Sequence, residues 1–419
     1  KLEAALQADV PVSIRINQRK GTGAPATPPV AWSETGYYLP QRLSFTFDPL
    51  FHAGAYYVQE ASSMFLEQAI RTFVSEPVKC LDLCAAPGGK STHLLSLLPE
   101  GSLLVSNEVI RTRSNILAEN ITKWGNPNSI VTNNDPEEIG RLTHLFDVIV
   151  TDVPCSGEGM FRRHPETRAE WSPESPAGCA KRQAEILDRA AEMLRPGGRM
   201  VYSTCTMNRT ENEDTVDAFL SRHADFSAEA FSLPGADAPD GMLTCYPHRM
   251  KGEGHFVALL RKHGDAPCNW QKTPEKDAPS KDALQALRAF CPTANANVMR
   301  TGSGKPGRSR DESVTLSCLP DRPVCDGIQV VRCGLQLGTV QKKLFVPDHA
   351  WAMSIFPPDV PRVALSREDA RRYQAGETLP ADGKGWALTC CDGIPLGWGK
   401  ISDGQMKNHY PKGLRRPLR

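Results

Sequence analysis

Short apolar runs alternate with amphipathic stretches through the middle of the chain, from Pro77 to about Lys262. The apolar runs have the length of buried β-strands, and the amphipathic stretches repeat their apolar positions with the period of an α-helix. Strands that alternate with helices form a parallel sheet covered by helices on both faces. The pattern therefore predicts an α/β domain built on a parallel sheet.

The predicted elements of this domain follow one another in a regular order. Its helices are expected at Ser91–Leu98, Arg111–Trp124, Lys181–Leu194 and Asn212–His223, and Pro196, Gly197 and Gly198 are expected to close the third helix. Its strands are expected at Val78–Leu83, Leu103–Ser106, Ser129–Thr132, Phe146–Thr151 and Arg199–Ser203, followed by a late antiparallel strand at Gly254–Arg261.

The pattern changes on both sides of this region. Ser13–Asn17 alternates as a strand does, within a short α+β segment, and Gly264–Lys281 has the composition of a linker. Thr301–Arg310 reads as a mobile loop, and beyond Ile328 short strands with glycine turns indicate a β-rich domain. The predicted division is an N-terminal segment (1–55), the α/β domain (56–263), a linker and accessory region (264–328) and a C-terminal domain (329–419).

Composition narrows the class of protein. The 419 residues are 40% hydrophobic and 23% charged, which is typical of two or three globular domains. A net charge of +1 excludes a polycation, so nucleic-acid binding would need local basic patches. The 13 cysteines show neither a disulfide framework nor a paired zinc motif, and neither a signal peptide nor a membrane span is visible. We expect a monomeric cytoplasmic enzyme with reduced thiols and no metal; because the sequence begins with Lys1, we also expect its N-terminus to be missing.

A glycine-rich turn, Ala85–Lys90, follows the first predicted strand and opens a helix. Glycine lets the backbone approach a ligand closely, and the helix N-terminus presents free amides. Glu108, just after the second strand, could accept hydrogen bonds from the hydroxyls of an adenosine ribose. Asp135 could bond the adenine amino group or simply cap a turn before Pro136. The turn is neither G-x-G-x-x-G nor a Walker A motif, so we predict an adenosine-containing cofactor other than a dinucleotide.

Two cysteines end neighbouring strands, Cys155 after Asp152 and Cys205 after Ser203. Because such strand ends share one crevice, both thiols can face the cofactor. A thiolate that adds to carbon 6 of cytosine makes carbon 5 nucleophilic enough to attack a sulfonium methyl group. A carboxyl group at the N3/N4 edge would stabilise the ring, a second thiol could assist release, and Lys90 could bond the base carbonyl or lower the pKa of a thiol. Spacing alone does not choose between the two cysteines as nucleophile.

Four motifs together resemble the Nol/Nop/Sun-type RNA cytosine-5 methyltransferases, and the resemblance covers about Val10–Arg261. The C-terminal tail is similar to the end of the bacterial branch that modifies small-subunit ribosomal RNA. The segment before Tyr57 looks shorter than the family's usual RNA-binding extension, and Gly264–Pro320 resembles nothing that we can name. The motifs and the tail are Tyr57–Met64, Cys84–Ser91, Asp152–Gly159, Ser203–Thr206 and Lys407–Arg416.

The resemblance implies a Rossmann-like S-adenosylmethionine-dependent methyltransferase domain, preceded by an RNA-recognition segment and followed by a PUA-like RNA-binding domain. It implies that Cys205 is the covalent nucleophile, that Cys155 assists product release, and that Asp152 and Lys90 lie near the target base. The product would be 5-methylcytidine in small-subunit (16S) ribosomal RNA. The residues implied to contact S-adenosylmethionine are Cys84, Ala85, Ala86, Pro87, Gly88, Gly89, Lys90, Glu108, Asp135 and Asp152.

A base that enters such a crevice must leave its stack, so an RNA loop or an opened helix is expected as the substrate. Arg162, Arg163, Arg415 and Arg416 could hold its phosphates. Three alternatives stay open: transfer RNA or DNA as the substrate, a catalytically silent RNA-binding protein, and an oxidoreductase with an adenosine cofactor. The absence of G-x-G-x-x-G argues against the oxidoreductase, and the intact cysteines argue against the silent protein.

Overall fold

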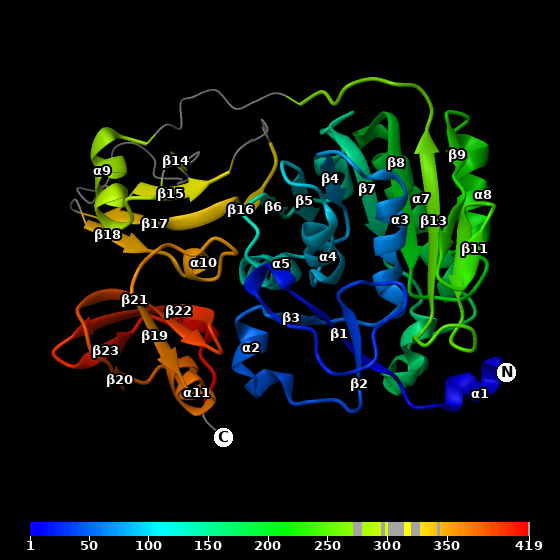
Figure 1. Cartoon of the computed structure of the whole chain (residues 1–419). Coiled ribbons are helices and arrows are strands. Elements are labelled where there is room, and N and C mark those ends of the chain that lie inside the picture. The colour runs from blue at the N-terminus through cyan, green and yellow to red at the C-terminus, as the bar shows by residue number, and fades with distance from the viewer. Residues whose placement is uncertain (271–278, 295–297, 301–313, 320–326, 342–343, 418–419) are drawn as a thin grey trace.

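A computed structural model describes the chain except for residues 271–278, 295–297, 301–313, 320–326, 342–343 and 418–419 (Figure 1). Its largest element is a mixed sheet with the strand order β12-β13-β8-β7-β4-β5-β6-β16, and β9 pairs with β13. The parallel strands are β4 (Lys79–Asp82), β5 (Leu103–Asn107), β6 (Ser129–Thr132), β7 (Phe146–Asp152) and β8 (Leu194–Thr204). The antiparallel strands are β9 (Phe226–Ala228), β12 (Met242–Cys245), β13 (His255–Lys262) and β16 (Val330–Cys333).

Side chains alternate between the two faces of this sheet, which separates two apolar cores. Leu104 belongs to the core under α3 (Leu66–Phe73), α4 (Gly89–Leu97) and α5 (Arg111–Trp124). Its neighbour Val105 belongs to the core under α6 (Pro136–Ile139), α7 (Ser175–Met193) and α8 (Glu213–Arg222). The predicted α/β fold class and the antiparallel direction of the late strand are confirmed.

One predicted helix end is wrong. Helix α7 ends at Met193, and strand β8 already begins at Leu194 and runs through Pro196, Gly197 and Gly198. Leu194 pairs with Phe146 of β7, and both side chains are buried in the same core. A Cβ atom on Gly198 would lie 2.9 Å from the carbonyl oxygen of Asp147, so glycine serves here to let the two strands approach, not to stop the helix.

The N-terminal segment is a small antiparallel sheet with the strand order β2-β1-β3. It confirms the strand predicted at Ser13–Asn17. In Figure 1 this blue sheet lies against the lower end of α4 and α5. Its elements are α1 (Leu2–Gln7), β1 (Val12–Ile16), β2 (Gly36–Leu39), α2 (Pro49–His52) and β3 (Tyr56–Val58), and a hairpin of β10 (Phe231–Leu233) and β11 (Ala236–Ala238) stands apart from both sheets.

Two further sheets follow α9 (Lys281–Phe290). The first pairs β14 (Val298–Arg300), β15 (Val314–Cys318), β17 (Leu335–Gln341) and β18 (Leu344–Pro347), and it precedes α10 (His349–Ala352). The second pairs β19 (Arg362–Leu365), β21 (Gly385–Cys391), β22 (Ile394–Ser402), β23 (Gln405–Asn408) and β20 (Leu379–Pro380), with α11 (Arg367–Ala375) against it.

Strand β15 pairs with β17 across the predicted boundary at 328/329, while β16 joins the central sheet at β6. The predicted domain boundaries themselves stay predictions. The loop predicted at Thr301–Arg310 lies outside the described residues, as do residues 271–278 of the predicted linker. None of the helices that the structure describes is long and apolar enough to span a lipid bilayer.

Candidate active site

A cavity of about 970 Å³ opens at the carboxyl ends of β4, β5, β6 and β7. It is lined by seven of the predicted site residues: Cys84, Ala86, Glu108, Asp135, Asp152, Cys155 and Cys205. Ala85, Pro87, Gly88, Gly89 and Lys90 are not among its lining residues; they form the turn and the first residues of α4 directly behind it. The structure therefore brings residues from the ends of five strands, β4 to β8, into one chamber, as the parallel topology requires.

The glycine-rich turn is held by side chains of α5. Gly88 adopts a positive φ of 112° and α4 begins at the next residue, Gly89. Arg113 donates to the carbonyl oxygen of Ala86 at 2.8 Å, and Asn120 donates to that of Pro87 at 2.7 Å. Because α5 fixes two successive carbonyl groups, the shape of the turn does not depend on a bound ligand.

Two carboxylates face the cavity from the ends of β5 and β6. Glu108 accepts a hydrogen bond from the amide of Ile110 at 2.9 Å and lies 3.5 Å from Arg113. Asp135 caps α6: it accepts from the amide of Glu138 at 2.8 Å, and Glu138 accepts from the amide of Asp135 in return. The capping alternative for Asp135 is thus present in the structure, and the same side chain also lines the cavity.

Lys90 and Asp152 form an ion pair of 2.7 Å at the edge of the cavity. Asp152 also accepts from the hydroxyl of Ser203 at 2.9 Å and lies 3.8 Å from His255. Burial acts to raise the pKa of Asp152, but Lys90, His255 and Ser203 outweigh it and hold the pKa below its ordinary value. Burial and the charge of Lys90 lower the pKa of His255 to about 3, so this imidazole is neutral at physiological pH.

The two thiols touch. Cys155 Sγ lies 3.2 Å from Cys205 Sγ, and both side chains are partly accessible from the cavity. The hydrogen bond with Cys205 and burial raise the pKa of Cys155 well above its ordinary value. Lys90 is engaged with Asp152, and the predicted effect of Lys90 on a thiol stays a prediction.

The chain matches four family models along its length. Residues 74–261 match the family model described as 16S rRNA methyltransferase RsmB/F, and residues 1–61 match the N-terminal domain of 16S rRNA methyltransferase RsmF. Residues 290–355 match the RsmF rRNA methyltransferase first C-terminal domain, so the prediction that Gly264–Pro320 has no resemblance is wrong for residues 290–320. Residues 360–416 match the methyltransferase RsmF PUA domain. The ribosomal RNA small subunit methyltransferase F of Klebsiella pneumoniae (strain 342) is 31% identical over 99% of this chain and 92% of its own length. The chain belongs to the RsmF family.

This RsmF-family chain has further relatives in sequence and structure. The ribosomal RNA small subunit methyltransferase F of Aeromonas salmonicida (strain A449) is 32% identical over 92% of this chain and 85% of its own length. A methyltransferase homologue from Pyrococcus horikoshii superimposes with a TM-score of 0.53 at 26% identity, covering 62% of this chain and 89% of its own. NSun6 from the same organism, solved with SFG, has the same TM-score at 20% identity, covering 63% of this chain and 94% of its own, and shows the shared fold. By family the chain is an RNA methyltransferase with a C-terminal PUA domain, and the predicted family is confirmed.

A buried carboxylate next to the cysteines escaped the sequence prediction. Glu211 is fully buried and accepts hydrogen bonds from the amide of Ser156 at 3.0 Å and from its hydroxyl. It also accepts from Gln183 at 2.9 Å and from Asn208 at 2.8 Å. Glu211 therefore joins the loop after Cys155 to the loop after Cys205. In the sequence it stands one residue before a predicted helix, where an acidic residue is ordinarily a surface feature.

Of the four arginines predicted to hold phosphates, two make contacts within the protein. Arg162 donates to the carbonyl oxygens of Ala5 and Gly252, and Arg163 forms an ion pair with Glu253, so both are engaged inside the protein. Arg415 is half-buried against Gly376, while Arg416 is exposed. A phosphate-binding role for all four stays a prediction, with Arg416 the freest to fulfil it.

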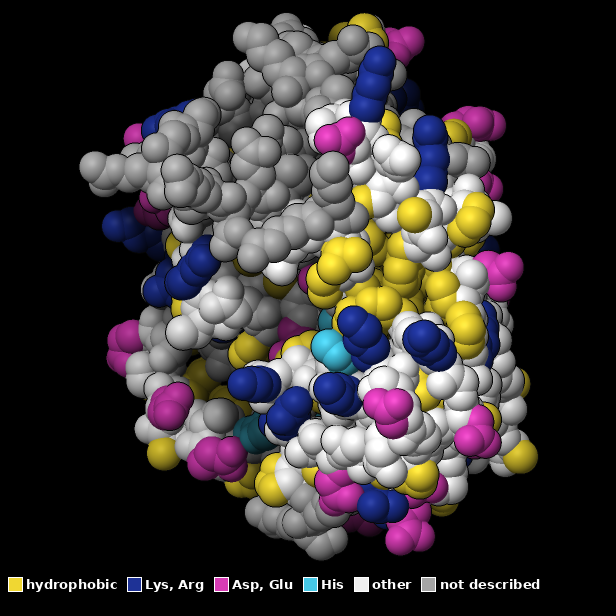
Figure 2. Space-filling model, turned by 90° about the vertical axis from the view of Figure 1, so that its left-hand side faces the viewer, with side chains coloured by type: hydrophobic (Ala, Val, Ile, Leu, Met, Phe, Trp, Pro, Cys, Tyr) yellow, Lys and Arg dark blue, Asp and Glu magenta, His cyan; other side chains and the backbone are white. Residues whose placement is uncertain are grey.

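Two lysines form a basic surface on the sheet of the PUA domain, which contains β19 to β23. Lys400 and Lys407 are exposed and directly paired across β22 and β23. Lys400 lies 5.5 Å from the ring of Trp386, which in turn lies 4.4 Å from the ring of His409. Figure 2 shows Lys and Arg side chains and a histidine gathered beside a hydrophobic patch on the side of the molecule that the C-terminal sheets form.

Proposed function

We propose that this chain methylates carbon 5 of a cytosine in small-subunit (16S) ribosomal RNA, with S-adenosylmethionine as the methyl donor and Cys205 as the nucleophile. The observation that carries the proposal is the pair of thiols, Cys155 and Cys205, 3.2 Å apart in the cavity that Asp152, the partner of Lys90, also lines. A thiolate that adds to carbon 6 of a pyrimidine activates carbon 5 for methyl transfer.

The residues present fit the proposed cofactor. A cavity of about 970 Å³ can enclose a nucleoside-sized ligand together with a target base. Glu108 lines the cavity at the end of β5 and can accept from ribose hydroxyls, and the segment between β4 and α4 contributes Cys84 and Ala86 to the cavity wall. When bound, S-adenosylmethionine would supply an electrophilic methyl group on its sulfonium sulfur.

The ion pair would recognise cytosine and orient it. Asp152 carries a lowered pKa and can accept from the exocyclic amino group of cytosine, while Lys90 can donate to the ring carbonyl. Uracil presents a carbonyl oxygen where cytosine presents that amino group, so the Asp152 carboxylate would repel it. The pair therefore supports cytosine over uracil as the target.

The two thiols would then have different roles in the reaction. The Cys205 thiolate would add to carbon 6, and carbon 5 would take the methyl group from the sulfonium sulfur, which would leave as a thioether. A water molecule acting as base would then remove the proton of carbon 5, and that electron pair would expel the Cys205 sulfur from carbon 6. Because the two sulfur atoms lie 3.2 Å apart, ionisation of Cys205 would disfavour ionisation of Cys155, in line with the raised pKa of Cys155. The choice of Cys205 as the attacking sulfur follows the family resemblance. Protonated Cys155 can then give a proton to the departing Cys205 sulfur.

The RNA would reach the cavity from surfaces outside it. The exposed pair Lys400 and Lys407 can neutralise phosphates, and Trp386 with His409 offers rings on which an unstacked base can lie. This surface supports an RNA contact by the PUA domain.

The test is methyl transfer from labelled S-adenosylmethionine to small ribosomal subunits, naked ribosomal RNA, transfer RNA and DNA from cells that lack the enzyme. We expect label in 5-methylcytidine from the ribosomal samples, and the ratio between subunits and naked RNA identifies the true substrate. Label only in transfer RNA would keep the chemistry and discard the ribosomal assignment. Label in another nucleoside, or in none, would overturn the proposal.

A further inference from the structure

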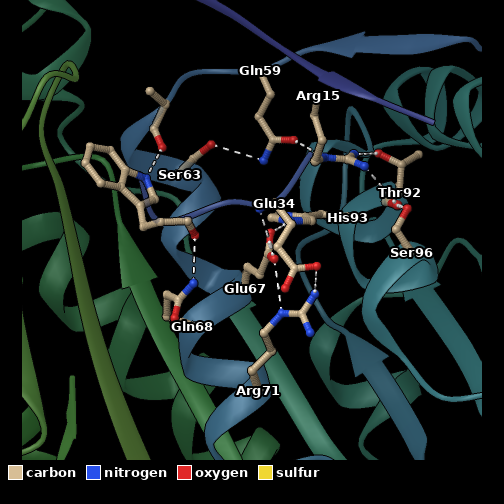
Figure 3. Close-up of polar contacts among 12 residues, drawn as sticks. Arg15, Glu34, Gln59, Ser63, Glu67, Gln68, Arg71, Thr92, His93 and Ser96 are labelled. Carbon is tan, nitrogen blue, oxygen red and sulfur yellow. Dashed lines mark hydrogen bonds and ion pairs between the residues drawn. The ribbon is translucent and has the colours of Figure 1, made fainter. Parts of the chain in front are cut away.

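A single buried arginine connects the N-terminal sheet to the turn before α4. Arg15 lies on β1 and is completely buried, among the largest fully buried side chains of the described chain. Its Nε donates to Gln59 at 2.9 Å, within the N-terminal segment. Its Nη2 donates to the Thr92 hydroxyl at 2.6 Å (Figure 3). The same Nη2 donates to the Gly89 carbonyl at 3.3 Å, and both partners lie in the first turn of α4.

The surroundings of Arg15 hold its guanidinium in one orientation. Its Cζ lies 4.4 Å from the ring of Trp124 at the end of α5, and 6.0 Å from the ring of Tyr57. Burial lowers the pKa of Arg15 to about 9, so the group still carries its charge at neutral pH. A buried cation is costly, and a packed apolar side chain would serve stability at least as well.

The groups that Arg15 contacts stand next to the predicted cofactor residues. Gly89 opens α4 directly after Gly88, whose φ of 112° shapes the turn. Lys90 follows at once and reaches Asp152 at 2.7 Å. Helix α5 fixes the carbonyl groups of Ala86 and Pro87, and Arg15 fixes the end of the same turn through β1.

We propose that Arg15 is a positioning residue for cofactor binding, which makes the N-terminal sheet a structural part of the cofactor site. The proposal rests on the proposed function, in which the turn before α4 binds S-adenosylmethionine. Arg15 holds Gly89 and Thr92 in place, and through them it sets the free amides of the turn and the origin of the Lys90 side chain. The N-terminal segment thus has a role in binding the cofactor besides any contact with RNA.

Three variants separate this role from general stability. Arg15→Lys keeps the charge but cannot bond Gln59, Gly89 and Thr92 at once, because an ammonium lacks the planar fork of a guanidinium. Thr92→Val keeps the shape of the side chain and removes the hydroxyl that accepts from Arg15. That hydroxyl also donates to the carbonyl oxygens of Gly88 and Gly89, so it links Arg15 to the turn. Arg71→Gln is the matched control: this arginine lies near the same contacts, but it is half-exposed and pairs with Glu67 and Glu34 instead of with α4 (Figure 3).

The experiment measures the Kd of S-adenosylhomocysteine by calorimetry, and the KM values for S-adenosylmethionine and RNA with kcat, on the full chain. Arg15→Lys should raise the Kd and the cofactor KM about tenfold and Thr92→Val about threefold, each corresponding to the loss of about one hydrogen bond or more. The KM for RNA should change less than about twofold, and Arg71→Gln should leave all values near those of the unaltered protein.

The outcomes are distinct. Unchanged Kd and cofactor KM in a folded Arg15→Lys protein, or in Thr92→Val where Arg15→Lys does not fold, would overturn the positioning role alone. Equal losses in cofactor and RNA KM would also overturn it, because a merely structural defect predicts them. If the unaltered protein binds no S-adenosylhomocysteine, the proposed function fails first.

Discussion

Replacing Glu211 by glutamine tests whether the cysteine loops are held by one carboxylate. Four groups donate hydrogen bonds to the Glu211 carboxylate: the amide and hydroxyl of Ser156, Gln183 and Asn208. The amide nitrogen of a glutamine would face donors in either orientation of its side chain. The change therefore removes charge-assisted bonds and leaves buried donors unsatisfied, each at about 1–3 kcal/mol.

The lost hydrogen bonds should displace Cys155, because Glu211 accepts from the backbone amide of the next residue, Ser156. A loss of about 2–4 kcal/mol, shared between folding and the position of the thiols, predicts a fall in single-turnover methyl transfer of about 10- to 100-fold at saturating cofactor. The Kd of S-adenosylhomocysteine should change little, since Glu211 does not line the cavity. Thermal unfolding measured in parallel reports the share of the cost that falls on stability.

Asp214→Asn is the matched control, because Asp214 is an exposed carboxylate near the start of α8, which begins two residues after Glu211. Asp214 is paired with Arg209 at 2.8 Å. An exposed pair contributes about 0–1 kcal/mol, so transfer and stability should stay close to those of the unaltered protein. The reasoning is refuted if Glu211→Gln transfers methyl groups and unfolds as the unaltered protein does.

Three further predictions follow from the same geometry. The pKa of Asp152 is depressed, so its ionised form is lost as the pH falls through that lowered value. Lys90→Met should raise the pKa of Asp152 and therefore move the acidic limb of the pH–rate profile to higher pH. An acidic limb that does not move would contradict this. Asn134→Ala removes two hydrogen bonds to the backbone of Gln329, at 2.9 and 3.2 Å, and should weaken S-adenosylhomocysteine binding about three- to tenfold by calorimetry; unchanged binding would show that this end of the cavity is held otherwise. Cys205→Ala should abolish labelled methyl transfer and keep cofactor binding, and surviving transfer would move the nucleophile elsewhere.

The elements that the sequence predicts well are those whose pattern is local. Helix α5 and strand β6 have the predicted bounds, because an amphipathic period and a short β-branched run each need only a few neighbouring residues. The end of α7 was wrong because Pro196 and the two glycines after it are helix-stopping residues that here belong to a strand. Their role depends on Asp147, which is far away in the sequence.

Contacts between residues far apart in the sequence could not be predicted from local patterns. The polar residues of β1 alternate with apolar ones as on a half-exposed strand, yet Arg15 is buried because α4 covers that face. Strand β16 pairs with β6 some two hundred residues earlier in the chain, and no periodicity indicates it. By contrast, Cys155 and Cys205 could be placed in one crevice, since parallel strands end at the same edge of a sheet.

The most direct test of the proposed chemistry is the site of covalent attachment in Cys155→Ala. This variant should accumulate a protein–RNA adduct that resists denaturation, because the thiol that assists release is gone. Digestion and mass spectrometry should find a methylated cytidine linked to the peptide that contains Cys205. A nucleotide on any other residue, or normal turnover with no adduct, would contradict the roles assigned to the two cysteines.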